Sequence, residues 1–368
     1  MKSYQYLLIA LLTLTLSECR NFSTVVPSSL TPTPKIIGVT PTLPTKTLSD
    51  WCTSLSQSDG LPANNIVRNS NIVYLGSNFE TGKFHDQVWK IFMGDGSEKL
   101  LLDDIPSPFL GIELLSDKYH FILAGSYTMI SDLDGSALKD VDNIDDLMVN
   151  FPPYSHVWNL LSSSPEAKDA GLRIFHSPNG THSAIWEASF SASALSILDK
   201  KNQKRTEVIY AEAPDSIQMG SWSPDGKYYA FPFYKNAKPY YSQVYIVSAD
   251  GTDMKPLSQP LEHEFLDHPP VWSPDGEKIA IPFLGADGWE HFVITNYMTG
   301  KTMNYRVSPI IKTDSIQGQE MDWSPDGKWL AYISQYGHYG IELLDTESGK
   351  IYCGLDNNKI SIKMLDWR

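Results

Sequence analysis

A five-residue string that recurs at a nearly constant interval constrains this chain more than any other feature of its sequence. The string Trp-Ser-Pro-Asp-Gly occurs three times, at Trp222–Gly226, Trp272–Gly276 and Trp323–Gly327, and its tryptophans are 50 and 51 residues apart. Chance recurrence at one period is negligible, so the chain contains an internal repeat. Such a repeat predicts a fold assembled from similar supersecondary units.

Each copy of the repeat predicts a tight turn followed by a strand. Serine, proline, aspartate and glycine favour the four successive positions of a type I turn. One alanine lies four residues after each turn glycine, which indicates a tight position between packed layers, and each tryptophan is expected to be a wedge between neighbouring sheets. The apolar segments and their alanines are Tyr228–Phe231 with Ala230, Ile279–Ile281 with Ala280, and Leu330–Tyr332 with Ala331.

Degenerate copies extend this pattern over most of the chain. His176–Gly180 reads His-Ser-Pro-Asn-Gly, and Leu115–Lys118 keeps the position of the turn without its proline and glycine. A second signature in each unit, an apolar run that ends in a turn, predicts a hairpin; the clearest is Val244–Val247 before Ala249–Gly251. Together these signals predict six units of short strands, and therefore an all-β fold.

The Trp-Ser-Pro-Asp-Gly repeats resemble the WD40-like repeats of the TolB-type β-propeller family, over about residues 69–368 and most closely over 218–350. The resemblance implies four-stranded blades around a central channel. The chain departs from TolB because no α/β domain precedes the propeller segment. The 297 residues from Asn71 to Trp367 give about 50 for each of six blades, which matches the period, whereas seven blades would give about 42. We therefore expect an all-β, six-bladed β-propeller of four-stranded blades.

The two ends of the globular segment predict how this propeller closes. The segment Leu365–Arg368 lies where another turn would begin, and Asn71–Leu75 is similar to the strand that follows such a turn. We expect Ile360–Trp367 to supply the inner strand of the first blade, which would pair sheet edges that are otherwise open. An unpaired C-terminal strand is the alternative.

The first 49 residues predict export and tethering. The apolar run Tyr6–Leu16 after Lys2 has the length of a signal-peptide core and is too short to span a bilayer stably. Leu16–Cys19 resembles a bacterial lipobox that would lipidate Cys19, although Glu18 stands where a small residue is usual. Plain secretion and an uncleaved anchor are the alternatives.

Sixteen of the thirty residues 20–49 are Ser, Thr or Pro, and such a stretch predicts an extended tether. The expected domains are a signal peptide with a possible lipobox at 1–19, a tether at 20–49 and a single β-propeller at 50–368. The protein would be anchored by lipid on the cell surface or in the envelope, or otherwise secreted.

Three cysteines are present, and if Cys19 is lipidated or removed, Cys52 and Cys353 remain. Two cysteines of an exported protein can pair, and this bridge would join the two ends of the fold. Two separate buried thiols are the alternative.

The charge of the chain excludes one class of partner. Lys and Arg number 29 and Asp and Glu 43, so the net charge is −14, which repels phosphate backbones. We expect no nucleic-acid binding, contact with a membrane only through a lipid anchor, and a monomer.

Catalytic and metal-binding patterns are weak. Gly220–Ser223 has the wrong spacing for a nucleophile elbow, and His263 and His268 are five residues apart, whereas a zinc-binding His-Glu-x-x-His helix places its histidines at i and i+4. The acidic segment that begins at Asp132 would place Ile130 at the first ligand position of a calcium loop. We therefore expect no catalytic residue, no metal and no cofactor.

A recurring polar string marks the candidate ligand-binding residues. Asp-Ser-Ile-Gln occurs at 215–218 and 314–317, each time before a repeat turn, and the third such connection carries Asp267 and His268. We expect these connections to line one mouth of the channel, where propellers commonly bind partners; polarity inherited with the repeat is the alternative. The candidates are Asp215, Gln218, Asp267, His268, Asp314 and Gln317.

Aromatic residues occupy equivalent loops before the third strands of three units. They predict either an exposed patch for a sugar or peptide, or packing on neighbouring blades. These residues are Tyr240, Tyr241, Trp289, Tyr336 and Tyr339.

The sequence favours a non-enzymatic, surface-tethered propeller that binds a protein, peptide or glycan at a channel mouth. A carbohydrate-active lyase or hydrolase on the same scaffold is the second hypothesis. It would require titratable groups that converge on the channel.

Overall fold

The computed structural model describes residues 53–54, 65–78, 85–105, 109–114, 120–125, 128–140, 171–236, 241–260, 269–285, 287, 289–309, 321–334, 340–355 and 360–367. All of them belong to Lys46–Arg368, the second of the two units into which the chain divides. The signal peptide, the lipidation of Cys19 and the tether predicted for residues 1–49 therefore lie outside the described residues and stay predictions.

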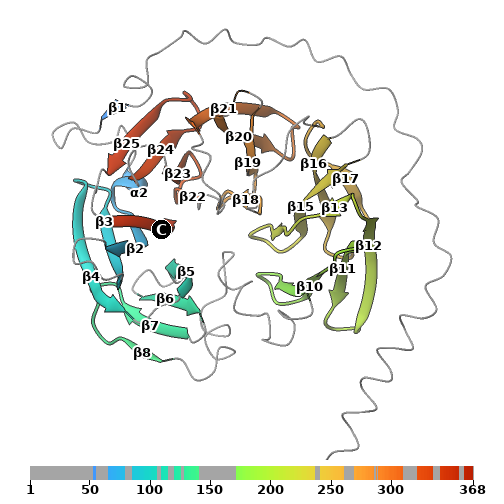
Figure 1. Ribbon diagram of the computed structural model, residues 1–368, viewed down its shortest axis with the longest axis horizontal. Coiled ribbons are helices and arrows are strands. Elements are labelled where there is room, and N and C mark those ends of the chain that lie inside the picture. Colours follow the sequence, from blue (N-terminus) through green and yellow to red (C-terminus); the bar gives the residue numbers. More distant parts are fainter. Residues whose placement is uncertain are drawn as a thin grey trace, which may run out of the picture. The chain divides into compact units, whose positions relative to one another are not determined.

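The described strands form six sheets, which we number in chain order (Figure 1). Sheet I is β26 (Ile360–Trp367), β2 (Asn71–Asn78), β3 (His85–Phe92) and β4 (Ser97–Ile105). Sheet II is β5 (Phe109–Leu114), β6 (His120–Gly125), β7 (Thr128–Asp132) and β8 (Lys139–Asp140). Sheet III is β9 (Leu172–His176), β10 (His182–Ala188), β11 (Ala192–Asp199) and β12 (Lys204–Glu212).

The other three sheets contain the Trp-Ser-Pro-Asp-Gly repeats. Sheet IV is β13 (Ser216–Ile217), β14 (Ser221–Trp222), β15 (Tyr228–Lys235), β16 (Tyr241–Ser248) and β17 (Met254–Pro256). Sheet V is β18 (Val271–Trp272), β19 (Lys278–Leu284), β20 (Trp289–Asn296) and β21 (Thr302–Pro309). Sheet VI is β22 (Met321–Trp323), β23 (Trp329–Ser334), β24 (Gly340–Asp345) and β25 (Ile351–Leu355), to which β1 (Thr53–Ser54) adds. The one helix among the described residues is α2 (Asn65–Arg68).

Each repeat forms the predicted turn. In the first copy the backbone N–H of Gly226 donates to the carbonyl of Ser223 at 2.8 Å, and Gly226 has a φ of 67°, which favours glycine. The Ser223 hydroxyl donates to Asp225 at 2.7 Å and accepts from the backbone N–H of Tyr228 at 3.0 Å. The degenerate copy keeps this device, because Ser177 donates to Asn179 at 2.8 Å.

The repeat tryptophans link the inner strands of neighbouring sheets. The indole N–H of Trp222 donates to the carbonyl of Phe175 in sheet III at 2.7 Å. Trp272 donates to Ser221 in sheet IV at 3.2 Å, and Trp323 donates to Val271 in sheet V at 3.0 Å. The three tryptophans therefore occupy the same place in consecutive sheets, as wedges that also carry a directed hydrogen bond.

The C-terminal strand β26 is paired within sheet I. It runs antiparallel to β2, with Trp367 opposite Ile72. Two buried aspartates fix its neighbours: Asp322 of sheet VI accepts a 2.8 Å bond from the Trp367 backbone N–H, and Asp366 accepts a 2.7 Å bond from Leu114 of sheet II. Strand β26 therefore lies between the inner strands of sheets VI and II.

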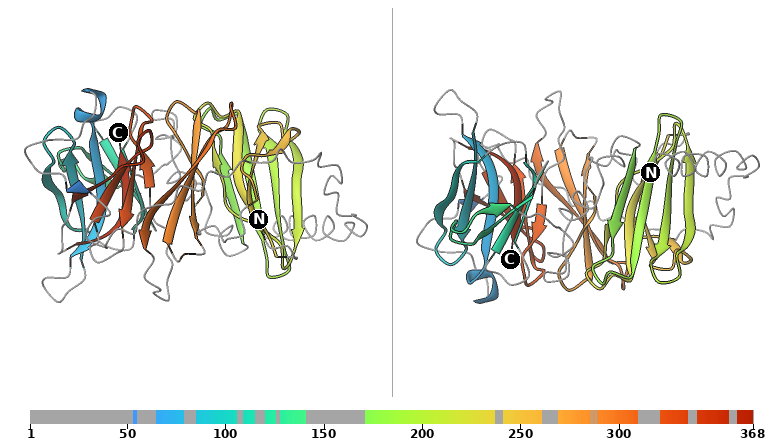
Figure 2. Two further views of the ribbon diagram at one scale, coloured as in Figure 1. Left: turned by 90° about the horizontal axis from the view of Figure 1, so that it is seen from above. Right: turned by 90° about the horizontal axis from the view of Figure 1, so that it is seen from below.

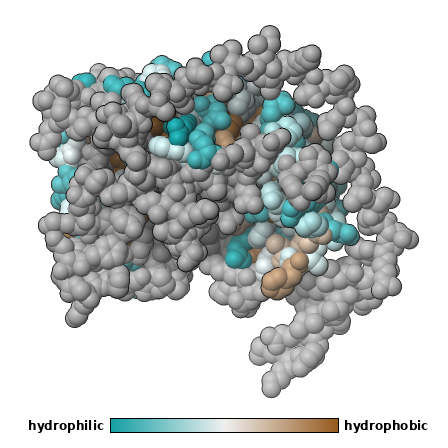
Figure 3. All heavy atoms as spheres, turned by 45° about the horizontal axis from the view of Figure 1, so that its top comes forward, coloured by the Kyte–Doolittle hydropathy of each residue, from teal (hydrophilic) through white to brown (hydrophobic). Residues whose placement is uncertain are grey.

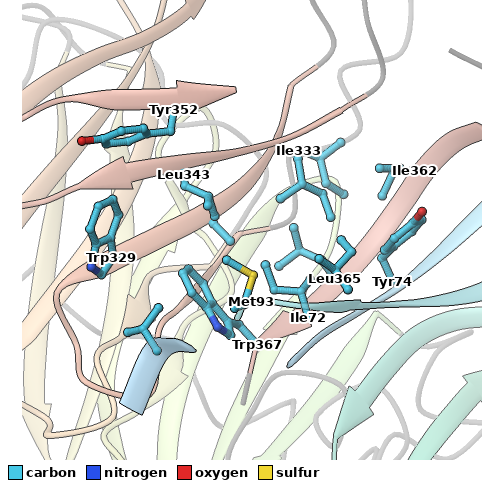
Figure 4. Packing of buried hydrophobic residues seen from close by; sticks show 14 residues of the cluster. Ile72, Tyr74, Met93, Trp329, Ile333, Leu343, Tyr352, Ile362, Leu365 and Trp367 are labelled. Carbon is cyan, nitrogen blue, oxygen red and sulfur yellow. The ribbon is translucent and has the colours of Figure 1, made fainter. Parts of the chain in front are cut away.

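Apolar side chains fill the seams between sheets. Figure 4 shows one seam, in which Trp367 and Leu365 of β26 pack with Leu343 and Trp329 of sheet VI. Ala230, Ala280 and Ala331 are fully buried, as the tight alanine position predicted. A larger side chain there would have to displace the facing sheet, because protein interiors are close-packed.

The two ends of the strands differ in what they carry. Seen from the side, the strands of the six sheets run between the same two ends (Figure 2). The repeat turns share one end with the hairpins that join third and fourth strands; in sheet V the backbone N–H of Tyr297 bonds the carbonyl of Glu277 at 3.1 Å. We call the opposite end, where second strands connect to third strands, the loop end.

Candidate functional site

The loop end of sheet V carries a group of polar and aromatic side chains that contact one another. Its members come from the β19–β20 connection, from the start of β20 and from the middle of β21. His291 and Arg306 are register partners. We call this group the Arg306 cluster: Asp287, Trp289, His291, Asn304 and Arg306.

The guanidinium group of Arg306 is held on two sides. Its Nε lies 3.1 Å from Asp287 Oδ2, and its Cζ lies 3.6 Å from the centre of the Trp289 ring. Stacking on the ring fixes the plane of the guanidinium, and the ion pair fixes its direction. Arginine side chains on surfaces are usually mobile, so this arrangement orients a group that elsewhere would have to be ordered on binding.

Both nitrogens of the His291 ring have partners. Nε2 lies 3.1 Å from Asp287 Oδ1, and Nδ1 lies 3.0 Å from Asn304 Oδ1. Partial burial acts to raise the pKa of Asp287, but the hydrogen bonds from His291 and from the Trp289 backbone, with the charges nearby, lower the pKa below its ordinary value. Asp287 is therefore a carboxylate at neutral pH, and His291 holds it in place.

Gly285 makes this arrangement possible. A Cβ atom at Gly285 would lie 2.5 Å from Asp287 Oδ1 and 2.6 Å from His291 Nε2. A larger residue would have to displace the ends of these two side chains, so the glycine leaves room for the pair as it is seen here.

Sheet IV repeats part of this arrangement. Tyr241 occupies the register position in β16 that Trp289 occupies in β20, since each lies five residues before the partner of the buried alanine (Ile246 and Ile294). The ammonium group of Lys235 lies 5.6 Å from the centre of the Tyr241 ring. Two consecutive sheets thus present a cation over an aromatic ring at the loop end.

A second polar group lies between sheets V and VI and is buried. Glu290 and Tyr332 are fully buried and Glu342 nearly so, and Tyr332 and Glu342 are register partners. Among the described residues, neither carboxyl oxygen of Glu290 has a hydrogen-bond partner. Burial and, next, the charge of Glu342 raise the pKa of Glu290 well above its ordinary value. Because this polar group is buried, it belongs to the packing between sheets V and VI and is not a binding site for a ligand from solvent.

The structure describes two of the six predicted ligand-binding residues, Asp215 and Gln218. They flank β13, which pairs with β15, and each contributes to local structure: Asp215 accepts a 2.8 Å bond from the Asn236 backbone, and Gln218 donates to Ser216 at 3.0 Å. Their role as ligand-binding residues stays a prediction. The other four lie outside the described residues: Asp267, His268, Asp314 and Gln317.

Of the predicted aromatic residues, Tyr241 and Trp289 are described. Both are partly exposed and lie under a cation, so they are neither a bare aromatic patch nor fully packed. The other three, Tyr240, Tyr336 and Tyr339, lie outside the described residues. The remaining members of the Arg306 cluster were not predicted, because no local string links residues 287 and 306.

The predicted disulfide is also only partly within the described residues. Cys52 lies outside them, and Cys353 is described as part of β25. The segment directly after Cys52 pairs with that strand: Thr53 lies opposite Tyr352, and Ser54 lies opposite Cys353, in parallel. Pairing of the two cysteines stays a prediction.

Two properties of the described part of the chain bear on the kind of site. It contains no group of three or more His, Cys, Asp or Glu side chains placed to hold a metal ion, and none of its helices is long and apolar enough to cross a membrane. On the face drawn in Figure 3, the coloured residues are mostly hydrophilic, with one hydrophobic patch toward the lower right.

Comparison with known proteins shows the scaffold. No protein-family model matches the chain, and no curated protein matches its sequence. The crystal structure of TolB from Acinetobacter baumannii superposes with a TM-score of 0.51 at 15% identity, over 81% of this chain and 66% of that chain. At this identity the likeness shows the fold alone: the chain has a TolB-like β-propeller scaffold and spans about two thirds of the length of that TolB.

Two further solved structures are similar at lower scores. A putative TolB from Agrobacterium tumefaciens has a TM-score of 0.41 at 18% identity, over 78% of this chain and 89% of that chain. An oligogalacturonate lyase in complex with manganese has a TM-score of 0.40 at 12% identity, over 76% of this chain and 78% of that chain. A fold does not by itself determine an activity, so the activity of this chain has to be argued from its site.

Proposed function

We propose that this chain is a non-enzymatic, surface-tethered β-propeller that binds a protein, peptide or glycan ligand at its loop end. The observation that carries the proposal is the Arg306 cluster, in which an arginine is fixed on a tryptophan by stacking and by an ion pair. Groups that are already ordered lose little entropy when a ligand binds, which is the property expected of a recognition surface.

The scaffold we propose has six blades and closes through the C-terminal strand, which joins the first blade. Six sheets, the pairing of β26 with β2, and the bonds between inner strands from sheet II through sheets I, VI, V and IV to sheet III support this proposal. The chain segment that connects sheet II to sheet III, residues 141–170, lies outside the described ranges.

Export, lipidation at Cys19 and a Cys52–Cys353 disulfide belong to the same proposal. The apolar run, the lipobox-like string and the Ser/Thr/Pro-rich segment support the first two, and the pairing of β1 with β25 supports the third. Intact mass spectrometry of the chain from a bacterial envelope, before and after reduction, tests both modifications. An unmodified N-terminus would exclude lipidation, and two free thiols would exclude the bridge.

The binding function is tested by screening the purified chain against a glycan array and a random peptide library. We expect Trp289→Ala to weaken binding of the selected ligand at least tenfold, because the variant removes the support of Arg306. Met298→Ser is the matched control, since Met298 is a large exposed apolar residue at the opposite end of the same sheet. Equal losses in the two variants would exclude a loop-end site.

A carbohydrate-active lyase or hydrolase is the alternative function. General acid–base catalysis needs a titratable group that can exchange a proton with the substrate. Both ring nitrogens of His291 have hydrogen-bond partners, which favours a role in positioning Asp287 over a role as a general acid or base. Turnover of an oligosaccharide that is lost in His268→Ala would support the enzyme and contradict the binding function.

A further inference from the structure

We propose that the outer edge of β21 binds an extended peptide, and that the terminal nitrogens of Arg306 hold a carboxylate of that peptide. The inference rests on the proposed binding function and specifies its ligand. It combines three observations: an open sheet edge, an arginine of the edge strand whose guanidinium is fixed over the neighbouring strand, and a strand added to the equivalent edge of another sheet in the same molecule.

The edge of β21 is open in the part of the chain that the structure describes. Strand β21 is last in the hydrogen-bonding order of sheet V, after β18, β19 and β20. Residues 302–304 and Arg306 are exposed along it. The outer edge of such a strand presents backbone N–H and C=O groups that can pair with another extended segment.

The molecule itself shows that a fourth strand of this scaffold can accept another strand. In sheet VI the equivalent strand, β25, is followed by β1, which pairs with it in parallel. Two residue pairs form there, Thr53 with Tyr352 and Ser54 with Cys353. Strand addition at the outer edge is therefore compatible with the geometry of these sheets.

Arg306 indicates what the added peptide carries. Among the described residues, the only ion pair or hydrogen bond of its guanidinium is the one from Nε to Asp287. Nη1 and Nη2 are therefore available as a two-pronged donor whose plane Trp289 fixes. That geometry matches the two oxygens of a carboxylate.

The charge of the chain limits how acidic this peptide can be. The net charge of −14 repels a run of acidic residues, and Asp287 lies beside the binding group. A single carboxylate flanked by peptide groups therefore fits better than an acidic stretch. A glycan is a poorer fit, because it lacks the alternating N–H and C=O groups that a sheet edge pairs with.

The test uses the purified full chain and an octapeptide selected from a random library. The octapeptide is remade in three forms: unmodified, with its carboxylates converted to amides, and with alternate backbone nitrogens methylated. The protein variants are Arg306→Gln, Arg306→Lys and, as matched control, Arg205→Gln. Arg205 lies on β12, the fourth strand of sheet III, and also pairs with a carboxylate, that of Glu187.

We expect amidation, methylation and Arg306→Gln each to weaken the affinity at least tenfold, and Arg205→Gln to leave it within twofold. Amidation of the peptide should weaken its affinity for the Arg306→Gln variant little further, because the amidation and the substitution remove the same contact. Arg306→Lys should bind with intermediate affinity, because lysine keeps the positive charge but lacks the two parallel N–H donors of the guanidinium. Unchanged thermal melting of the variants shows that they are folded.

Three outcomes would overturn the inference and leave the proposed function standing. They are equal binding by Arg306→Gln and the wild type, equal binding of the methylated and unmodified peptides, and binding of a glycan but of no peptide. Failure of every glycan and peptide to bind the wild-type chain would instead contradict the proposed function itself.

Discussion

Glu290 shows at the scale of one residue how the seam between sheets V and VI depends on protonation. Its carboxyl group is fully buried, and Glu342 of the facing sheet contributes a second carboxyl to the same polar group. Burial and the neighbouring carboxyl of Glu342 raise the pKa of Glu290, so Glu290 binds its proton more tightly than an exposed glutamate does. Phe292, two residues further along β20, packs edge-on against Tyr332.

The stability of the protein should therefore depend on the protonation of Glu290. Its pKa is raised above the ordinary 4.5, so the stability it contributes is fully present below pH 4.5 and is lost as the pH rises through the folded-state pKa. We expect Glu290→Gln to have a higher free energy of unfolding than the wild type at pH 8, by at least about 1 kcal/mol, and a flatter pH profile.

Urea unfolding between pH 5 and pH 8 measures this difference. Glu347→Gln is the control, because Glu347 is exposed and makes only a surface ion pair with Lys328. Parallel pH profiles of Glu290→Gln and the wild type would show that the fold does not raise the pKa of Glu290.

At the scale of elements, short inner strands are joined by side chains rather than by ladder bonds. Strands β22 and β26 belong to different sheets, and Asp322 joins them by accepting the backbone N–H of Trp367, while its other oxygen accepts that of Trp323. Asp366 joins β26 to β5 of sheet II by accepting the backbone N–H of Leu114. A buried carboxylate that accepts two backbone bonds specifies the order of neighbouring strands.

We expect Asp322→Ala to destabilise the protein by about 1–3 kcal/mol, because it leaves a buried backbone N–H of Trp367 without an acceptor. The midpoint of urea denaturation measures the loss. Asp253→Ala is the control, since Asp253 is exposed beside a surface hairpin. A midpoint unchanged in Asp322→Ala would mean that β26 is held by apolar packing alone.

The sequence predicted the turns and strands within these sheets but not the hydrogen bonds that join one sheet to the next. The strings at Trp222, Trp272 and Trp323 determine local turns, and the pairing of each following strand depends on near neighbours in the chain. By contrast, Asp322 and Trp367 are 45 residues apart, and Leu114 and Asp366 are 252 apart. No local pattern reports such a contact.

The candidate site was predicted only at Trp289, for a similar reason. Trp289 stood out as one of a set of aromatic residues at equivalent positions, whereas Arg306 lies in a strand whose exposed face can carry any polar residue. Its role arises from the register of β20 and β21, which places it opposite His291. Glu290 was missed because an isolated glutamate at the start of a strand normally predicts exposure.

At the scale of the whole molecule, the C-terminal segment should be indispensable and the N-terminal tether dispensable for stability. Removal of residues 360–368 takes the inner strand from sheet I and removes Ile362, Leu365 and Trp367 from the seam of Figure 4. We expect this truncation to abolish the cooperative melting transition, because it opens a buried edge and an apolar seam together.

Deletion of residues 20–49 removes more than three times as many residues and should leave the melting temperature within about 1 °C, since a segment rich in Ser, Thr and Pro buries no core. Differential scanning fluorimetry of both shortened chains makes the comparison. A cooperative transition in the C-terminal truncation at the wild-type temperature would contradict the role of β26.

The pairing of β1 with β25 also determines where mechanical load enters the folded unit. A pull on the segment that precedes Thr53 acts first on the two residue pairs that join β1 to the rim of sheet VI. Two residue pairs are a weak junction, so in the reduced chain β1 is expected to detach from β25 before the longer strand pairs separate. The proposed Cys52–Cys353 bridge would instead carry the load directly into β25, so the redox state of these cysteines would decide whether the unit keeps its first strand under tension.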